Sequence, residues 1–318
     1  MMTSIQILRQ SLPNLQVQVP LAPMTTFRVG GSAEFFVKAS DAQQLEGAIR
    51  AALDASVPFT VLGGGSNVLV ADSGIRGLVV HSSGGIVQWN GEQARADAGV
   101  LLAQFVSEAT QKGMSGLEYA AGIPGTVGGA VRGNAGTRVG ETSERIVAVG
   151  AISPSAVKKM FDPVSCEFQY RHSFFKHSGW IVLRAVFQFQ LGDPAQIRSR
   201  VQEYQKHKTA TQQVGAPNSG CIFQNTRLDA KEEHRLKGLG LEKGIRNHCM
   251  ASGWIIEEAG LKGLCIGGAQ VSDVHANFIA NTGDATAEDI VMLIGVIKQK
   301  IRTQYGIQLR EEIQLLGW

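Results

Sequence analysis

The sequence predicts an α+β protein with more than one domain. In the first third, short β-rich segments and helical segments follow one another without the regular strand–helix order of a doubly wound sheet. Farther along, one long segment alternates polar and apolar residues and is followed by strong helical patterns. The length of 318 residues exceeds that of an ordinary single domain.

The first elements are defined by β-rich runs and glycine stops. We expect the first helix at about 42–55, between the first two strands, and a second helix at 100–112, which Gly113 ends. Glycine and serine bound the remaining β-rich runs. The expected strands are 33–38, 59–62, 77–81, 85–89 and 94–98.

The second half contains one clear strand and three helical patterns. Residues 181–191 alternate as a half-buried strand does, and a charged helix is expected from Pro194 to about residue 210. A loop rich in Gly and Pro follows, and we place a domain boundary near residue 205. Further helices are expected at about 251–260 and after Thr286, which can cap the last helix.

Composition excludes several classes of protein. Hydrophobic residues are 44%, charged residues 18% and the net charge +3, which argues against disorder and against a nucleic-acid-binding face. The first 19 residues lack the unbroken apolar core of a signal peptide. The sequence contains no run of 18 apolar residues, so no membrane span is predicted. The four cysteines are not spaced as metal ligands are, so we expect no metal site. We expect the cysteines to be free thiols and the protein to be cytoplasmic.

A glycine loop directly follows the second expected strand. Leu62, Gly63, Gly64, Gly65, Ser66 and Asn67 form it. Three glycines let backbone N–H groups converge on an anion, and the two polar residues can add contacts, as a diphosphate requires. The loop lacks the Gly-Lys-Ser/Thr of a P-loop and the last glycine of the dinucleotide fingerprint. A plain glycine turn between strands is the alternative.

A second glycine segment covers residues 122–136. Six glycines and a proline in fifteen residues predict neither an ordinary helix nor an ordinary strand. A backbone wall against a flat ring or a phosphate would explain this composition. A disordered linker is the alternative, but Ile123, Val127 and Val131 favour a packed segment.

These two segments, in this order, resemble the FAD-binding module of the vanillyl-alcohol-oxidase type. More narrowly, the chain resembles the UDP-N-acetylenolpyruvoylglucosamine reductase family, because further family-like motifs follow in order to the C-terminus. The motifs are TTFRVGG at 25–31, EYAAG at 118–122, YRHSFFK at 170–176, GWIIE at 253–257, AGLKG at 259–263, IGGA at 266–269 and HANFI at 275–279.

The resemblance implies an oxidoreductase that uses FAD and NADPH. It implies reduction of UDP-N-acetylglucosamine enolpyruvate to UDP-N-acetylmuramate in peptidoglycan precursor synthesis. It also implies two FAD subdomains, 1–80 and 81–205, and a substrate domain, 206–318. The implied cofactor-binding residues are Leu62, Gly63, Gly64, Gly65, Ser66, Asn67, Gly122, Ile123, Pro124, Gly125, Thr126, Gly128, Gly129 and Asn134.

Two implied catalytic residues stabilise an enolate-like carbanion. Arg171 lies in the family's Tyr-Arg-x-Ser motif, and its guanidinium can hold the substrate carboxylate through two parallel hydrogen bonds. Glu312, rather than Glu311, fits the family's C-terminal Leu-x-x-Glu pattern. A carboxyl group beside a negative substrate has a raised pKa and can donate a hydrogen bond to the enolate.

The proton donor departs from the commoner family pattern. Cys221 occupies the position of the usual serine, and Gln224 replaces a lysine. A thiol with a pKa of about 8.5 is mostly protonated at neutral pH and can supply the proton. A buried structural cysteine is the alternative, and Ser219 is a candidate substitute two positions away.

The implied substrate contacts are Tyr170, Lys176 and Asn225. The stretch between Arg171 and Cys221 is too short for the tyrosine-bearing lid loop that some family members carry. Two other functions stay open: another FAD-linked oxidoreductase on the same module, and a non-catalytic flavin or sugar-nucleotide binding protein.

Overall fold

The computed structural model describes residues 3–212 and 215–318, which form two compact units. The first unit contains residues 3–19, 33–65 and 75–208, and the second contains 20–32, 66–74, 209–212 and 215–318. Segments 20–32 and 66–74 were expected in the first FAD subdomain but belong to the second unit. The expected division into three domains stays a prediction.

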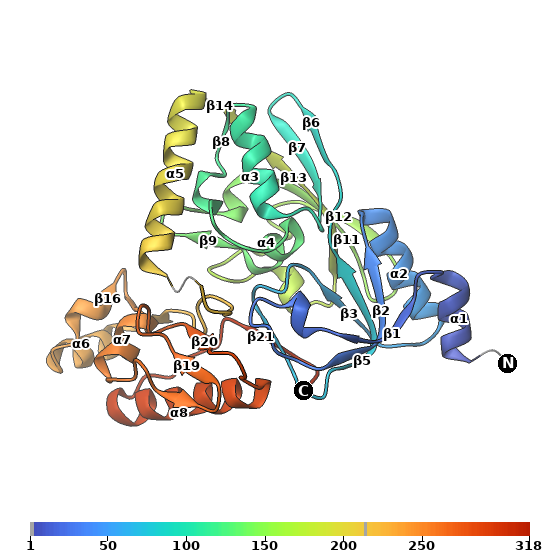
Figure 1. Ribbon diagram of the computed structural model, residues 1–318. Helices are drawn as coiled ribbons and strands as arrows, with labels where there is room; N and C mark the ends of the chain where they lie inside the picture. Colours follow the sequence, from blue (N-terminus) through green and yellow to red (C-terminus); the bar gives the residue numbers. More distant parts are fainter. Residues whose placement is uncertain (1–2, 213–214) are drawn as a thin grey trace. The chain divides into compact units, whose positions relative to one another are not determined.

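The first unit contains a small sheet with parallel pairs and a larger antiparallel sheet (Figure 1). The small sheet has the order β1-β2-β5-β3, and both β2 and β3 run parallel to β5. Its strands are β1 (Gln16–Pro20), β2 (Ser32–Ala39), β3 (Phe59–Leu62) and β5 (Ile75–Ser82).

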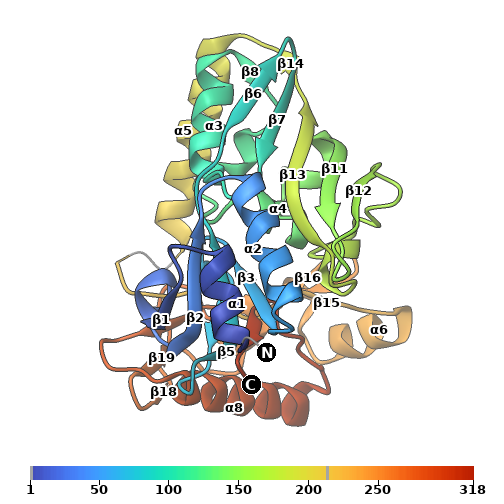
Figure 2. The same cartoon turned by 90° about the vertical axis from the view of Figure 1, so that its right-hand side faces the viewer.

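The larger sheet is antiparallel, with the order β12-β11-β13-β7-β6. Figure 2 shows β13, β11 and β12 beside one another. The strands are β6 (Val87–Asn90), β7 (Gln93–Asp97), β11 (Ile146–Ile152), β12 (Lys158–Phe161) and β13 (Ile181–Gln188).

Helix α2 (Ala42–Asp54) contacts both sheets of this unit, through β5 and β13. Its buried face is largely alanine, which lets the two layers approach closely. The Asp41 side chain caps the helix by accepting a hydrogen bond from Gln44 N at 2.8 Å. The other helices of the unit are α1 (Ser4–Ser11), α3 (Leu102–Gln111), α4 (Val127–Gly133) and, for all but its last residues, α5 (Pro194–Thr211).

Two expectations about this unit were wrong. The strand expected at 181–191 is divided, because the chain leaves the large sheet at Phe189, whose ring is buried against Phe105. The residues after it form β14 (Gln190–Leu191), which pairs with β8 (Met114–Ser115). The second glycine segment was expected to form no regular helix, yet its middle forms α4. The short pair β9 (Gly136–Thr137) and β10 (Gly140–Glu141) follows it.

The second unit has its own hydrophobic core, to which Phe27 and Leu69 contribute. Asn281 Nδ2 donates to Phe27 O at 3.0 Å and joins segment 20–32 to the C-terminal part of the chain. Asp72 accepts hydrogen bonds from Ala287 N and Glu288 N, at 2.9 and 3.1 Å, at the start of α8 (Ala287–Tyr305). These contacts explain why the two early segments belong to this unit.

Helix α8 packs against β18 and β19 with the apolar stripe that the sequence predicts, and Thr286 caps it as expected (Figure 1). The remaining helices are α6 (Ala230–Gly238) and α7 (Ser252–Glu258). The strands are β4 (Val68–Val70), β15 (Thr226–Arg227), β16 (Ile245–Arg246), β17 (Cys249–Met250), β18 (Cys265–Ile266), β19 (Ala269–Val271), β20 (Ile279–Asn281) and β21 (Gln314–Leu316).

Candidate active site

The two glycine segments touch each other in the first unit. A Cβ atom on Gly63 would lie 2.7 Å from Thr126 Oγ1, and one on Gly64 would lie 2.8 Å from Gly125 Cα. No side chain fits between Gly64 and the Gly125 backbone at this distance, so the first loop needs glycine here. Gly65 and Gly125 also have positive φ, at 62° and 115°. The two loops therefore form one continuous backbone surface.

Helix α4 begins directly at this contact. The Thr126 side chain caps it by accepting a hydrogen bond from Gly129 N at 3.4 Å. A Cβ atom on Gly128 would lie 2.8 Å from Ala98 Cβ, so this glycine allows the helix to pack against the end of β7. These tertiary contacts stabilise a helix that glycine alone disfavours.

The start of the second segment is partly exposed and partly packed against the core of the first unit. Gly122, Pro124 and Gly129 are exposed, whereas Ile123 is half-buried against the core of the first unit. Lys208 Nζ donates to Gly122 O at 2.8 Å and fixes the start of the segment. An exposed backbone wall beside a glycine loop fits a flat cofactor that carries a diphosphate, and FAD is such a cofactor.

A histidine lies beside the first loop. His81 pairs with Leu62 across β3 and β5, and Leu62 is itself buried. Burial lowers the pKa of His81, Lys38 lowers it further, and a hydrogen bond to the Gly63 backbone opposes this shift. The imidazole is therefore neutral at neutral pH.

Ser66 and Asn67 belong to the second unit. Asn67 Nδ2 donates to Glu312 O at 3.2 Å, and Asn67 O accepts a hydrogen bond from Gln314 N at 3.0 Å. Strand β4, which follows, pairs in parallel with β21. Asn67 thus holds the backbone of the expected catalytic glutamate.

Asn134, an expected cofactor ligand, has its side-chain amide inside the protein. The residue is 0% exposed and ends α4 in a left-handed conformation. Its Nδ2 atom donates to Gln169 O, and its Oδ1 atom accepts from Ser143 N, both at 3.0 Å. The amide therefore joins the end of α4 to the segment that carries Arg171.

Arg171 lies in a tight two-residue turn. Gln169 and His172 exchange both backbone hydrogen bonds at 3.0 Å, which leaves Tyr170 and Arg171 as the central residues. The Arg171 guanidinium lies 5.1 Å from the centre of the Tyr170 ring, in a cation–π arrangement. Lys176 Nζ donates to Arg171 O at 3.0 Å.

Cys221 and Glu312 lie on neighbouring extended segments of the second unit. Phe223 bridges Glu311, and Glu312 N donates to Ile222 O at 2.7 Å. On the other side, Cys221 bridges Phe278. The structure therefore brings these two expected catalytic residues into adjacent chain segments, and Arg171 belongs to the first unit.

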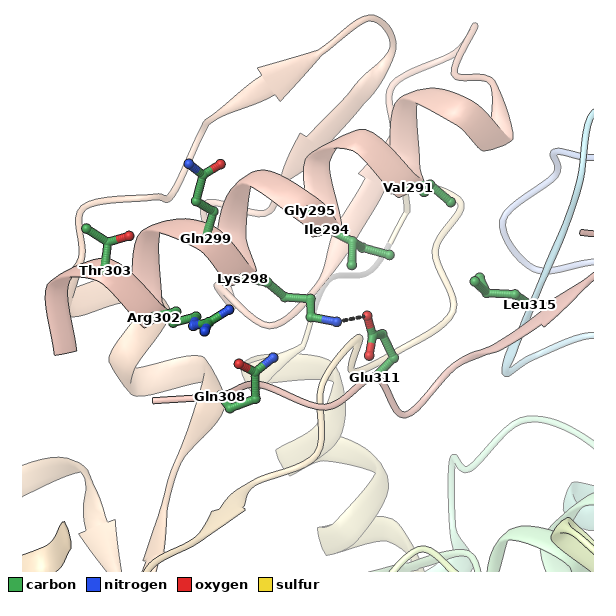
Figure 3. Close-up of a pocket in the computed structure, with 10 residues that line it drawn as sticks. All are labelled: Val291, Ile294, Gly295, Lys298, Gln299, Arg302, Thr303, Gln308, Glu311 and Leu315. Atoms are coloured by element: carbon green, nitrogen blue, oxygen red, sulfur yellow. Dashed lines mark hydrogen bonds and ion pairs between the residues drawn. The ribbon is translucent and has the colours of Figure 1, made fainter. Parts of the chain in front are cut away.

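The two neighbouring glutamates have different surroundings. Glu311 forms an ion pair with Lys298 of α8 at 2.5 Å. The pair lies in a groove of about 650 Å³ that is lined by α8 and by Gln308, Glu311 and Leu315 (Figure 3). Adjacent side chains of an extended segment point to opposite faces, so Glu312 points away from Lys298. This difference supports Glu312 as the functional member of the pair.

Asn277 is a site residue to which the sequence analysis gave no role. Its side chain accepts a hydrogen bond from Phe223 N at 3.0 Å and donates one to Phe223 O at 2.8 Å. It thereby fixes the segment that carries Cys221. The signals in the sequence were the family-like motif at 275–279 and a polar residue within the apolar run 276–280.

Asn225, an expected substrate contact, is exposed and accepts a hydrogen bond from Ser252 N at 3.1 Å. All four cysteines are free thiols, and Cys166 is fully buried. Burial raises the pKa of Cys166 to about 12, so this thiol is inert at neutral pH. No cluster of metal-ligating side chains occurs in the described part of the chain.

Comparison with known proteins places the chain in a family. Residues 212–316 match the model of the UDP-N-acetylenolpyruvoylglucosamine reductase C-terminal domain, and residues 33–156 match that of an FAD binding domain. A UDP-N-acetylenolpyruvoylglucosamine reductase from Synechococcus sp. (strain JA-3-3Ab) is 38% identical over 95% of this chain and 91% of its own length. The chain belongs to the UDP-N-acetylenolpyruvoylglucosamine reductase family.

Two further relatives agree. The reductase from Acaryochloris marina is 37% identical over 97% of both chains. The crystal structure of the reductase from Thermus caldophilus is 31% identical, covers 95% of this chain and 99% of its own, and superposes with a TM-score of 0.76. The predicted α+β fold, with an FAD-binding module and a C-terminal domain of this family, is confirmed.

Proposed function

We propose that this protein reduces UDP-N-acetylglucosamine enolpyruvate to UDP-N-acetylmuramate, with FAD as cofactor and NADPH as reductant, in peptidoglycan precursor synthesis. Family membership over nearly the whole chain supports this reaction. The observation that carries it is the close contact of Gly63 and Gly64 with Thr126 and Gly125 of the second glycine segment, which fits a flavin dinucleotide. The partners are accordingly small molecules.

The two glycine segments are proposed to hold the cofactor. Residues 62–67 would lie against its diphosphate, and residues 122–129 would line its flat ring. When bound, FAD would supply hydride transfer from NADPH to the enolpyruvyl group.

Arg171 is proposed to bind the substrate carboxylate. The planar guanidinium can donate two parallel hydrogen bonds to it, and it holds the negative charge that develops when the double bond is reduced. Stacking on Tyr170 orients the guanidinium. Tyr170 itself is half exposed and is proposed to contact the substrate.

Cys221 and Glu312 are proposed to complete the reaction. The thiol of Cys221 would give its proton to the substrate carbon, and Glu312 would donate a hydrogen bond to the enolate oxygen. Their adjacent segments, which Asn277 fixes, support a joint role. Asn225, beside this segment, is proposed to contact the substrate. The expected substrate contact of Lys176 and cofactor contact of Asn134 stay predictions.

We propose a cytoplasmic location for this reaction. The four free thiols support a reducing compartment. Within the described ranges, no helix has the length and apolar character that crossing a bilayer requires.

A visible spectrum of the purified protein tests this proposal. We expect flavin absorption bands that NADPH bleaches in the absence of air, and that the enolpyruvyl sugar nucleotide restores. A colourless protein that refuses added FAD would contradict the proposal. Restoration by oxygen together with no response to the sugar nucleotide would indicate another FAD-linked oxidoreductase.

A further inference from the structure

The backbone of Arg171 adopts a conformation that arginine rarely takes. Its φ is 55°, in the left-handed region, and of the two central residues of its turn only Arg171 has a positive φ. A turn of this pattern favours Gly or Asn at its second central position. Such a conformation persists only where the surroundings enforce it, and it is common at functional sites.

Two side chains hold the carbonyl oxygens of this turn. Lys176 Nζ donates to Arg171 O, and Asn134 Nδ2 donates to Gln169 O, both at 3.0 Å. Asn134 is fully buried and Lys176 is half-buried, so both contacts are partly sheltered from water. Each residue therefore acts on the backbone beside the guanidinium.

Helix α4 provides the frame for both contacts. Ser173 Oγ donates to Arg132 O at 2.7 Å, and Arg132 Nη2 donates to Lys176 O at 3.3 Å. The last turn of α4 thus holds the loop on which Lys176 lies. The first turn of α4 lies where the two glycine segments touch each other. The same short helix connects the proposed flavin surface to the arginine turn.

We propose that Lys176 and Asn134 are positioning residues, which hold Arg171 in its left-handed turn and so aim the guanidinium at the substrate carboxylate. This inference rests on the proposed function. It assigns Lys176 a task other than direct contact with the substrate, and Asn134 a task other than contact with the cofactor.

A double-mutant cycle on the FAD-loaded enzyme tests the role of Lys176. We expect Lys176→Met to lower kcat by about tenfold to a hundredfold, because a small displacement of a catalytic group has such effects. In an Arg171→Ala background the same substitution should change kcat by less than about twofold, since it acts only through Arg171. Lys176→Arg, which keeps a donor, should restore part of the rate.

Additive effects of the two substitutions would overturn the proposal, because Lys176 would then act on the substrate independently of Arg171. NADPH-dependent bleaching of the flavin serves as the control reaction, since it involves no substrate carboxylate. Asn134→Gly, which accepts the left-handed conformation but lacks the amide, should likewise lower kcat without slowing the bleaching. Slower bleaching in this variant would indicate a cofactor contact instead.

A measurement without substrate tests the turn itself. Glycine accepts a positive φ and alanine does not, so Arg171→Gly should melt about 2 °C higher than Arg171→Ala. At a position with ordinary backbone conformation, glycine gives a less stable protein than alanine does. Equal melting temperatures of the two variants, or a lower one for Arg171→Gly, would therefore contradict the strained turn. If the wild-type enzyme fails to turn over the enolpyruvyl substrate, the proposed function is wrong. The comparison of melting temperatures does not depend on turnover and still tests the strained turn.

Discussion

Gly64 and Gly125 lie so close that a Cβ atom on Gly64 would be 2.8 Å from the Cα atom of Gly125. Backbone cannot yield at this distance as a flexible side chain could. The contact therefore fixes the surface on which the flavin is proposed to lie, and it makes the cofactor site sensitive to one added methyl group.

Gly64→Ala should weaken FAD binding. Overpacking of this kind costs about 1–3 kcal/mol, which corresponds to about fivefold to 150-fold in Kd. The ratio of flavin to protein after purification, and titration with FAD, measure this effect. Gly47→Ala is the matched control, because no described atom outside the neighbouring backbone of α2 lies within 4 Å of its Cβ position. It should bind FAD normally and gain up to about 1 kcal/mol of stability.

Glu312→Gln should lower kcat by about 10²–10³-fold, because a preorganised donor at the developing enolate would be altered. Steady-state kinetics with the enolpyruvyl substrate provides the measurement. Glu311→Gln breaks the ion pair with Lys298 and should cost no more than about 1 kcal/mol of stability, with kcat within about twofold of wild type. A larger loss of kcat at Glu311 than at Glu312 would reverse the assignment.

Cys221→Ala should lower kcat by about 10²–10⁴-fold, since it removes the proposed proton donor. Cys221→Ser should retain part of the activity, because a hydroxyl can donate the same proton. Peroxide should inactivate the wild type and spare Cys221→Ser. Cys265→Ser, at an exposed thiol, is the control and should behave as wild type. Undiminished turnover in both Cys221 variants would remove this thiol from the mechanism.

Asp72→Ala should destabilise the second unit by about 1–2 kcal/mol, because two backbone N–H groups at the start of α8 lose their acceptor. Urea unfolding measures the loss. Asp54→Ala provides the comparison: this exposed aspartate ends α2, where a negative charge opposes the helix dipole, so its removal should be neutral or slightly stabilising. Equal losses in both variants would show that Asp72 does not act as a cap.

Stability should fall as the pH drops below about 6.5, the ordinary pKa of histidine, partly because of His81. Its pKa is lowered in the folded protein by burial and by Lys38, so the unfolded chain takes up the proton first. The contribution of His81 to the free energy of unfolding is therefore fully present above a pH of about 6.5. It is lost as the pH falls through the lowered pKa. His81→Gln should show a shallower decrease in the free energy of unfolding between pH 7.5 and pH 5 (about the range in which histidine titrates). An equally steep decrease in this variant would exclude His81.

The helices and strands of the first unit between residues 32 and 112 could be predicted from local patterns. The expected helix at 42–55 is observed at Ala42–Asp54, and the expected strand at 59–62 is observed with the same limits. Here the apolar spacing, the Asp41 cap and the glycine stops act within a few residues of one another. Helix α4 was not predicted, because its stability comes from Ala98 and from the Thr126 cap rather than from its glycine-rich composition. Helix α1 and strands β1, β11 and β12 were not predicted either.

The candidate site was only partly accessible from the sequence. The two glycine segments were identified, but their direct contact depends on how β3 and α4 pack. The left-handed conformation of Arg171 has no signature in the sequence, since arginine does not favour it. The part that Asn277 plays in fixing Phe223 became visible only from the hydrogen bonds.

The fold class, the positions of the glycine loops and the resemblance to a family could be inferred from the residues alone, because these depend on residue types and short-range order. That segments 20–32 and 66–74 join the second unit, and that Lys176 and Asn134 contact the turn of Arg171, became visible in the three-dimensional structure. Those features depend on hydrogen bonds and packing between residues far apart in the chain, and no local pattern encodes them.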